Sequence, residues 1–296
     1  MTRLAHFLLL LLLLLLPGTA LAHDGREHEI GWTLTPLVTA PLALAAFLYA
    51  AGLARLWRRS DRGRAGLRRD GLLFAAGWLS LAGALVSPLH SAGEVSFTMH
   101  MIEHEILMLV SALLLVAARP GAAFLWALPP PLRRPFASAG RWGLWRVLTD
   151  PFVATAIQAV AIVAWHVPWL FDLALSSDGW HIAQHLSFVG SALLFWWAML
   201  HGRTGRRAFL VPALCLFLTS MVGGGLGALM ALASSPWYAG YAAMGMTAIG
   251  LSPEQDQQLA GLLMWIPGGL YHLAAALWFL MRGLRLSEGS HAVPSR

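Results

Sequence analysis

The sequence predicts an all-α, polytopic membrane protein with seven transmembrane helices. Of its 296 residues, 58% are hydrophobic and only 11% are charged, whereas about a quarter of the residues in a soluble domain are charged. The apolar residues fall into blocks of about 20, the length that crosses the bilayer core as a helix. The ten-residue segments of alternating polarity that indicate a transmembrane β-barrel are not visible. A water-soluble globule is therefore excluded, and the lipid bilayer is the first expected partner.

The N-terminus has the pattern of a secretory signal peptide over residues 1–22. Arg3 is followed by an apolar run, a proline–glycine break and the triplet Ala20-Leu21-Ala22. This order matches the charged, apolar and small-residue regions of a cleaved signal. An uncleaved first span is the alternative, but the apolar run is short for one. Cleavage would leave His23 as the mature N-terminus and residues 23–33 as a short exported segment.

Seven apolar blocks follow and define a membrane domain at residues 34–285. We expect the spans at 34–54, 71–89, 97–118, 151–170, 181–201, 208–232 and 257–281. All 20 basic residues are Arg, and apart from Arg3 and Arg26 they lie in alternate connections or after the last block. Positive charge marks the cytoplasmic side, so the N-terminus is predicted outside, the C-terminus inside, and 286–296 a cytoplasmic tail. The arginines thus indicate orientation in a membrane, and no nucleic-acid partner is expected.

With this orientation, most membrane histidines lie in the outer half of the bilayer. His100 and His104 open the third span, His181 and His185 open the fifth, and His166 comes late in the fourth. The i, i+4 spacing places both imidazoles of a pair on one helix face. Imidazole is the commonest metal ligand in proteins, so two such pairs facing each other predict a metal site.

Further residues at the same depth are candidates for this site. Asp256 opens the seventh span and is predicted as another ligand or as a group that orients one. Accessory candidates are His90, Met99, Met101 and His23. Thioethers suit Cu(I), which favours copper as the metal.

A structural interpretation of these histidines stays open beside the metal site. A lone membrane histidine is usually an interhelical hydrogen-bond donor, and His201 and His272 are interpreted in that way. Glu103 and Glu105 either accept hydrogen bonds from imidazoles or lie at the lipid–water boundary. Five histidines on one leaflet favour the metal site, because ionisable groups inside a membrane are costly and tend to be functional.

No catalytic constellation is visible in the sequence. G-x-S-x-G, H-E-x-x-H and P-loop motifs do not occur. The single cysteine, Cys215, permits neither an intrachain disulfide nor CxxC chemistry. We therefore expect a protein that is not an enzyme.

Several motifs resemble the CtaG family of bacterial cytochrome c oxidase assembly factors, of the multi-span membrane type. They are Ser87-Pro88-Leu89, Met99-His100-Met101-x-x-His104, His166 with Pro168, His181-x-x-x-His185 with Phe195-Trp196-Trp197, and Asp256-Gln257-Gln258-x-x-Gly261 with Met264-Trp265. The likeness extends over roughly residues 30–281. It implies seven spans and a role in building haem–copper oxidase, at a copper-delivery step, with oxidase subunits as partners. The implied site residues are His100, His104, His166, His181, His185 and Asp256, with His90 a weaker match.

Two other functions remain open from the sequence. A haem- or metal-dependent membrane redox protein would hold its cofactor between the paired histidines of the third and fifth spans. A copper permease would need a polar path through the whole membrane, and below the outer leaflet the sequence offers mainly His272 and Cys215.

Overall fold

The structure, a computed structural model, is a bundle of helices. It describes residues 30–60, 63–138, 143–202 and 209–291, and these ranges contain no strand. Six helices are long and apolar enough to cross a membrane, and a bent helix pair makes a seventh if it counts as one span. This confirms the predicted all-α polytopic class. The predicted signal peptide, residues 1–22, and His23 lie outside the described residues.

The spanning helices follow the predicted apolar blocks closely. They are α2 (Pro36–Arg59), α3 (Arg64–Val86), the continuous run of α5 (Phe97–Glu105), η1 (Ile106–Ser111) and α6 (Ala112–Ala117), α12 (Asp178–His201), α13 (Leu210–Ala231) and α15 (Pro253–His291). The segment η1 is a π-helix, which the sequence did not indicate. The helix α15 extends beyond residue 285, so part of the predicted tail is helical.

Two predicted spans end earlier than expected, and a proline explains each case. The second span stops at Val86, because Ser87 caps a new short helix, α4 (Pro88–Gly93), by accepting a hydrogen bond from Leu89 N. The fourth breaks into α10 (Pro151–Trp165) and α11 (Pro168–Ser176), bent by 75°. Proline lacks an N–H and disfavours helical backbone in the residue before it, and Val167 is extended at this bend.

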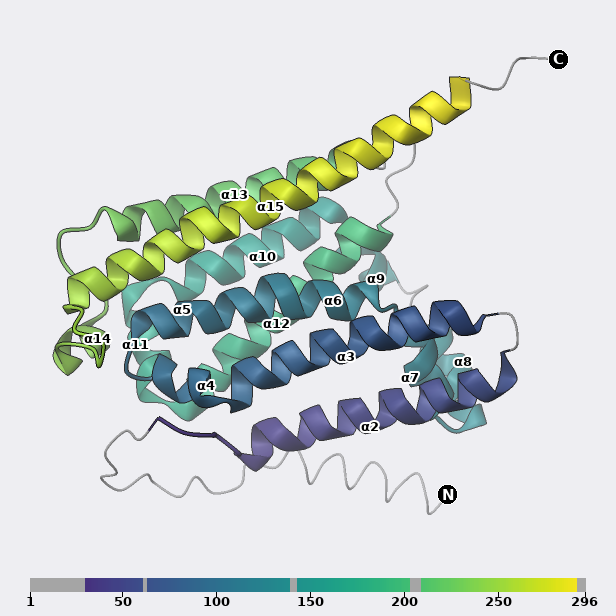
Figure 1. Cartoon of the computed structure of the whole chain (residues 1–296), viewed down its shortest axis with the longest axis horizontal. Coiled ribbons are helices and arrows are strands. Elements are labelled where there is room, and N and C mark those ends of the chain that lie inside the picture. The colour runs from purple at the N-terminus through teal and green to yellow at the C-terminus, as the bar shows by residue number, and fades with distance from the viewer. Residues whose placement is uncertain (1–29, 61–62, 139–142, 203–208, 292–296) are drawn as a thin grey trace.

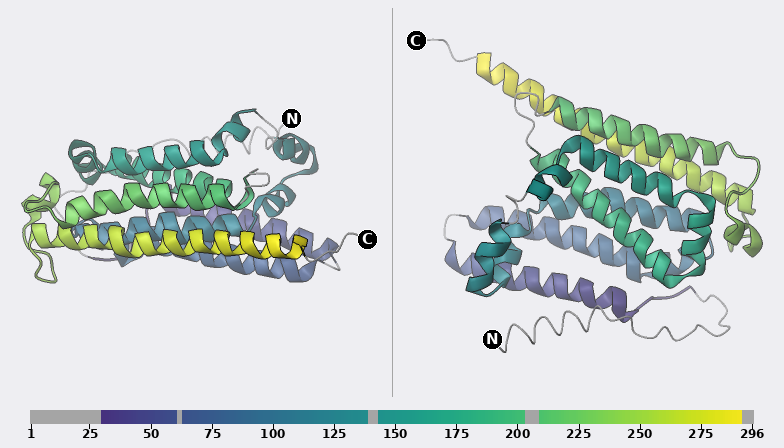
Figure 2. Two further views of the ribbon diagram at one scale, coloured as in Figure 1. Left: turned by 90° about the horizontal axis from the view of Figure 1, so that it is seen from above. Right: turned by 180° about the vertical axis from the view of Figure 1, so that it is seen from behind.

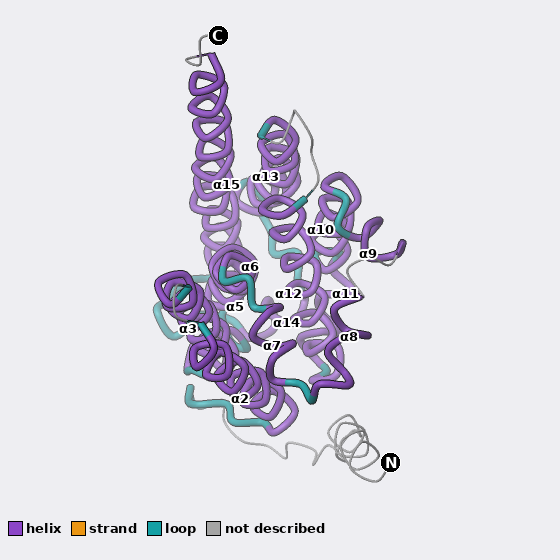
Figure 3. Tube along the Cα trace, turned by 90° about the vertical axis from the view of Figure 1, so that its right-hand side faces the viewer, coloured by secondary structure: helices purple, strands orange, loops and turns teal. Residues whose placement is uncertain are grey.

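The helices lie side by side in a flattened bundle (Figure 1). The α13–α15 pair forms one edge, α2 and α3 form the other, and the remaining spans lie between them (Figure 3). The short helices α4, α11 and α14 (Ala239–Met244) gather at one end, which we name the histidine end. The opposite end, which we name the arginine end, carries α7 (Gly121–Ala127), α8 (Pro130–Ser138) and α9 (Gly143–Leu148), as both views of Figure 2 also show.

Charged and apolar side chains are distributed as a membrane protein requires. At the arginine end, Arg119 pairs with Asp70 at 2.9 Å, and Arg55 donates to two carbonyl oxygens at the end of α7. The connections at the histidine end, 87–96, 166–177 and 232–252, contain no arginine. Along the spans, large apolar side chains such as Leu186 point outward and are 69% exposed, as expected for surfaces that face lipid.

Packing between α13 and α15 depends on two glycines. A Cβ at Gly227 would lie 2.6 Å from the Gly261 carbonyl oxygen, and a Cβ at Gly261 would lie 2.5 Å from the Gly227 carbonyl oxygen. Small residues allow such close backbone approach in membranes. We expect Gly227→Val to destabilise the protein by about 1–3 kcal/mol through overpacking, measured by unfolding in detergent. Gly225→Val, where a Cβ meets nothing within 4 Å, should leave stability unchanged.

Candidate metal centre

Three helices bring five imidazoles together at the histidine end, and we name them the histidine cluster: His90 on α4, His100 and His104 on α5, and His181 and His185 on α12. Ring centroids within the two helical pairs are 4.2 and 4.4 Å apart. Across the helices, His100 lies 5.4 Å from His181 and His104 lies 5.2 Å from His185. The two predicted i, i+4 pairs therefore face each other.

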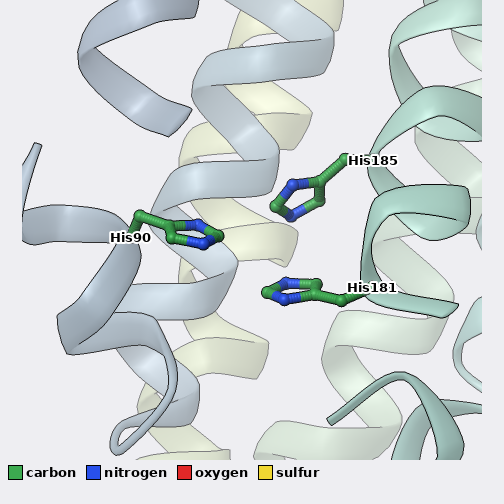
Figure 4. A group of neighbouring side chains, drawn as sticks. All are labelled: His90, His181 and His185. Atoms are coloured by element: carbon green, nitrogen blue, oxygen red, sulfur yellow. The ribbon is translucent and has the colours of Figure 1, made fainter. Parts of the chain in front are cut away.

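His90 completes the cluster from a short helix outside the spans. Its ring stacks 5.2 Å from His181 and lies 5.7 Å from His185. Figure 4 shows these three side chains converging, with His90 opposite the other two. Tyr241 donates a hydrogen bond to the carbonyl of Gly93 at the end of α4, and Gly93 packs against the His100 backbone. These contacts hold α4 beside α5, so the accessory candidate His90 lies within the cluster.

The α5 helix is held in position by a cap from another helix. Asp256, at the start of α15, accepts hydrogen bonds from the Phe97 and Thr98 amides at 2.7 and 3.1 Å and from the Ser96 hydroxyl at 3.0 Å. Carboxylates satisfy the free N–H groups of a first helical turn and favour its positive dipole end. Asp256 therefore fixes the turn that precedes His100. This geometry supports a positioning role, with both carboxylate oxygens engaged away from the imidazoles.

Glu103 places a carboxylate inside the histidine cluster. The residue is fully buried. Its Oε1 atom lies 2.8 Å from His90 Nδ1 and 3.8 Å from His185 Nε2. The sequence allowed two interpretations of Glu103, as an acceptor of hydrogen bonds from imidazoles or as a residue at the lipid–water boundary. The structure shows it as an acceptor. Its position three residues after His100 was the available signal, because i and i+3 share a helix face.

The pKa of His90 reflects this carboxylate. Burial alone would lower it, but the hydrogen bond and charge of Glu103, with Glu94 and Asp178 nearby, raise the pKa above the ordinary value of 6.5. The Glu103 carboxylate therefore strengthens the binding of a proton by His90. A metal ion at this position would take the place of that proton.

Several ring nitrogens of the cluster are buried without a hydrogen-bond partner among the described residues. They are both ring nitrogens of His100 and the Nε2 atoms of His104, His181 and His185, and Glu103 Oε2 shares this property. Buried polar atoms are nearly always paired in proteins. Two groups have ligand atoms within 4.8 Å of one another, His90–His181–His185 and His100–Glu103–His181. A cation bound by imidazole and carboxylate would satisfy these atoms, so the residues fit a metal such as copper.

His166 lies at the bend between α10 and α11, beside the cluster. It is near enough to His100 and His104 to interact with them electrostatically. Its Nδ1 lies 2.7 Å from the Ile162 carbonyl oxygen, so Nδ1 carries the proton, and the buried Nε2 has no partner among the described residues. A histidine oriented by a backbone carbonyl in this way is prepared as a ligand through its other nitrogen.

The remaining methionines and histidines are not members of the histidine cluster. Met101 is 1% exposed within the apolar core, and Met99 is half-buried; their accessory roles stay predictions. His201 is exposed at the far end of α12, tilted over Trp197. His272 lies on α15 and lines a small internal cavity.

The fold and the site together define a class of protein: a multi-pass helical membrane protein with a buried cluster of imidazoles and one carboxylate at one end. Within that class, the chain belongs to the cytochrome c oxidase caa3 assembly factor family (Caa3_CtaG), whose sequence pattern it matches over residues 47–285. The match covers most of the chain and confirms the resemblance found in the motifs.

The chain is also similar in sequence to curated proteins from mycobacteria. The chain is 28% identical over 192 residues to an uncharacterized protein of Mycobacterium bovis and, equally, to one of Mycobacterium tuberculosis. These alignments cover 61% of this chain but 28% of each relative. The chain thus spans little more than a quarter of the length of the curated relatives it matches. No solved structure matches.

Proposed function

We propose that the protein assists assembly of haem–copper cytochrome c oxidase by holding copper at the histidine cluster and passing it to an oxidase subunit. The oxidase enters the proposal from the family to which the chain belongs, whose description is cytochrome c oxidase caa3 assembly factor. The observation that carries the copper step is the convergence of five imidazoles and Glu103 from three helices, with buried nitrogens that have no protein partner in the described chain. Imidazole and thioether ligands both suit copper.

The arrangement of the cluster suits a carrier that must release its metal. His90 and His181 are half-buried, whereas His100 and His104 are 2% and 1% exposed. An accepting protein therefore reaches the cluster through His90 and His181, and ligand exchange begins there. On this proposal the copper is cargo and the protein is not an enzyme.

The proposal places the histidine end on the outer side of a bacterial plasma membrane. Described arginines gather at the opposite end, and the connections beside the cluster have none. Positive charge is retained on the cytoplasmic side. Copper would then be bound and transferred where the exported part of an oxidase subunit is within reach.

The haem alternative fits the cluster less well. A haem needs a flat slot for its macrocycle between the ligand helices, and here the imidazoles contact one another across that space, His104 and His185 edge to face at 5.2 Å. Purified protein is therefore expected to show no Soret band. The permease alternative needs a continuous polar path, and the cluster itself lies at one end of the bundle (Figure 1).

Copper content of the purified protein tests the proposal. After copper loading in detergent, mass spectrometry should find more copper per chain in the wild type than in His100→Ala/His181→Ala. This change removes a ligand from each group and should weaken copper binding at the histidine cluster at least about 100-fold. His201→Ala is the matched control, because it removes a histidine from α12 outside the cluster and should bind copper normally. A wild type that binds no copper would contradict the proposal.

A further inference from the structure

A second polar site lies deeper in the bundle, where α5 and η1 meet α10, α13 and α15. It is a cavity of about 20 Å³, room for roughly one water molecule or one metal ion. Its lining includes Glu105, Gln158 and His272 together with the sulfur-bearing side chains of Met108 and Met264. These residues come from four helical segments and lie outside the histidine cluster.

Two oxygens of this cavity have no partner among the described residues. They are Glu105 Oε2 and Gln158 Oε1, and both atoms are buried. The Gln158 amide nitrogen is 3.4 Å from Met108 Sδ, so its oxygen is left for another partner. A carboxyl group buried in a membrane either keeps its proton or is balanced by a cation, and the two unpartnered oxygens of Glu105 and Gln158 are free to bind one.

The Glu105 carboxylate lies close to the backbone of α15. A Cβ at Gly268 would lie 2.9 Å from Glu105 Oε2, so glycine keeps that position open. The Gly268 carbonyl oxygen accepts a hydrogen bond from His272 Nδ1 at 2.8 Å. Because a carbonyl can only accept, Nδ1 carries the proton and Nε2 of His272 keeps its lone pair as a potential metal ligand.

We propose that this cavity is a second binding site for a soft monovalent cation, copper(I), in addition to the histidine cluster. The ligand class follows from the donors: an imidazole, thioethers and one carboxylate suit Cu(I) rather than a hard ion. The charge follows from the single carboxylate, since a monovalent ion beside one glutamate leaves the membrane interior with no net charge. Sodium matches the charge but not the thioethers.

The helix α5 contributes to both sites, through adjacent residues. His104 faces the cluster, and the next residue, Glu105, faces α15. The π-helix η1 begins immediately after Glu105, and its carbonyls at Met108 and Leu109 are held by the side chains of Trp196 and Tyr271. π-Helical segments frequently occur at functional sites. On this basis the deeper site is a second holding position for copper, a role that rests on the proposed copper function of the cluster.

A variant that lacks the histidine cluster isolates the deeper site. The full-length protein with His100→Ala/His181→Ala/His185→Ala is loaded with Cu(I) under reducing, oxygen-free conditions, and copper is measured by mass spectrometry and X-ray absorption. It should retain about one copper ion per chain with sulfur among its ligands. Adding Glu105→Gln and Met264→Leu should remove that copper and its sulfur scattering.

The outcomes separate the deeper site from the proposed function. Copper in the wild type but none in the cluster-deleted variant would overturn the deeper site and leave the proposed function standing. Retained copper without sulfur ligands, or unchanged by Glu105→Gln and Met264→Leu, would also overturn it. A wild type that binds no copper at all would overturn both. Glu105→Gln and Met264→Leu conserve size, and each is also tested singly, with elution volume and helical content confirming that the variant is folded.

Discussion

Replacing His100 and His181 with alanine together should lower the amount of active cytochrome c oxidase in membranes by about ten-fold or more. His181 belongs to both groups of close ligand atoms and His100 to one of them, so each group falls to two ligands or fewer. The protein itself should remain in the membrane at normal levels, because the cluster is not what holds the spans together. Oxidase activity and immunoblots of isolated membranes measure the two quantities.

Added copper separates delivery from simple docking of the oxidase. If the double variant fails because copper reaches the oxidase too slowly, excess copper in the medium should restore part of the activity. If the cluster only binds a partner protein, copper should restore nothing. The His201→Ala variant, altered on the same helix α12 but at its other end, should show normal oxidase. Normal oxidase in the double variant would contradict the copper proposal.

The spans were predictable because the bilayer fixes their length. Each needs about 20 apolar residues, and the arginines mark the connections between them. The bend after Trp165 is indicated in the sequence by Pro168, but a hydropathy pattern alone does not detect it. The π-helix was not predictable, because its wider turn depends on tertiary contacts such as the Trp196 indole on the Met108 carbonyl.

The site was predictable only where local geometry determines it. The i, i+4 spacing placed His100 with His104 and His181 with His185, and in the structure the two pairs lie opposite each other on neighbouring helices. His90 was predicted only as an accessory candidate, because its position depends on the short helix α4 and on contacts of that helix with distant residues. Glu103 was ambiguous for the same reason: whether it faces lipid, water or imidazole is decided by helices far away in the sequence.

The sequence predicts Asp256 as a metal ligand or as a group that orients one, and the structure shows it capping α5. Alanine at this position would leave three buried donors, the Phe97 and Thr98 amides and the Ser96 hydroxyl, without their acceptor. We expect Asp256→Ala to lower the free energy of unfolding by about 3 kcal/mol, measured by denaturation of the detergent-purified protein.

Asparagine at position 256 distinguishes a cap from a ligand. It keeps one acceptor oxygen of similar geometry, so Asp256→Asn should recover roughly half of the stability lost in the alanine variant. If Asp256 only positions α5, the copper bound per folded molecule should remain near the wild-type value in Asp256→Asn. If the carboxylate is itself a ligand, copper affinity should fall by about ten-fold or more while stability changes little. Measuring unfolding and copper binding on the same preparation therefore decides between the two roles, because a cap alters the first quantity and a ligand alters the second.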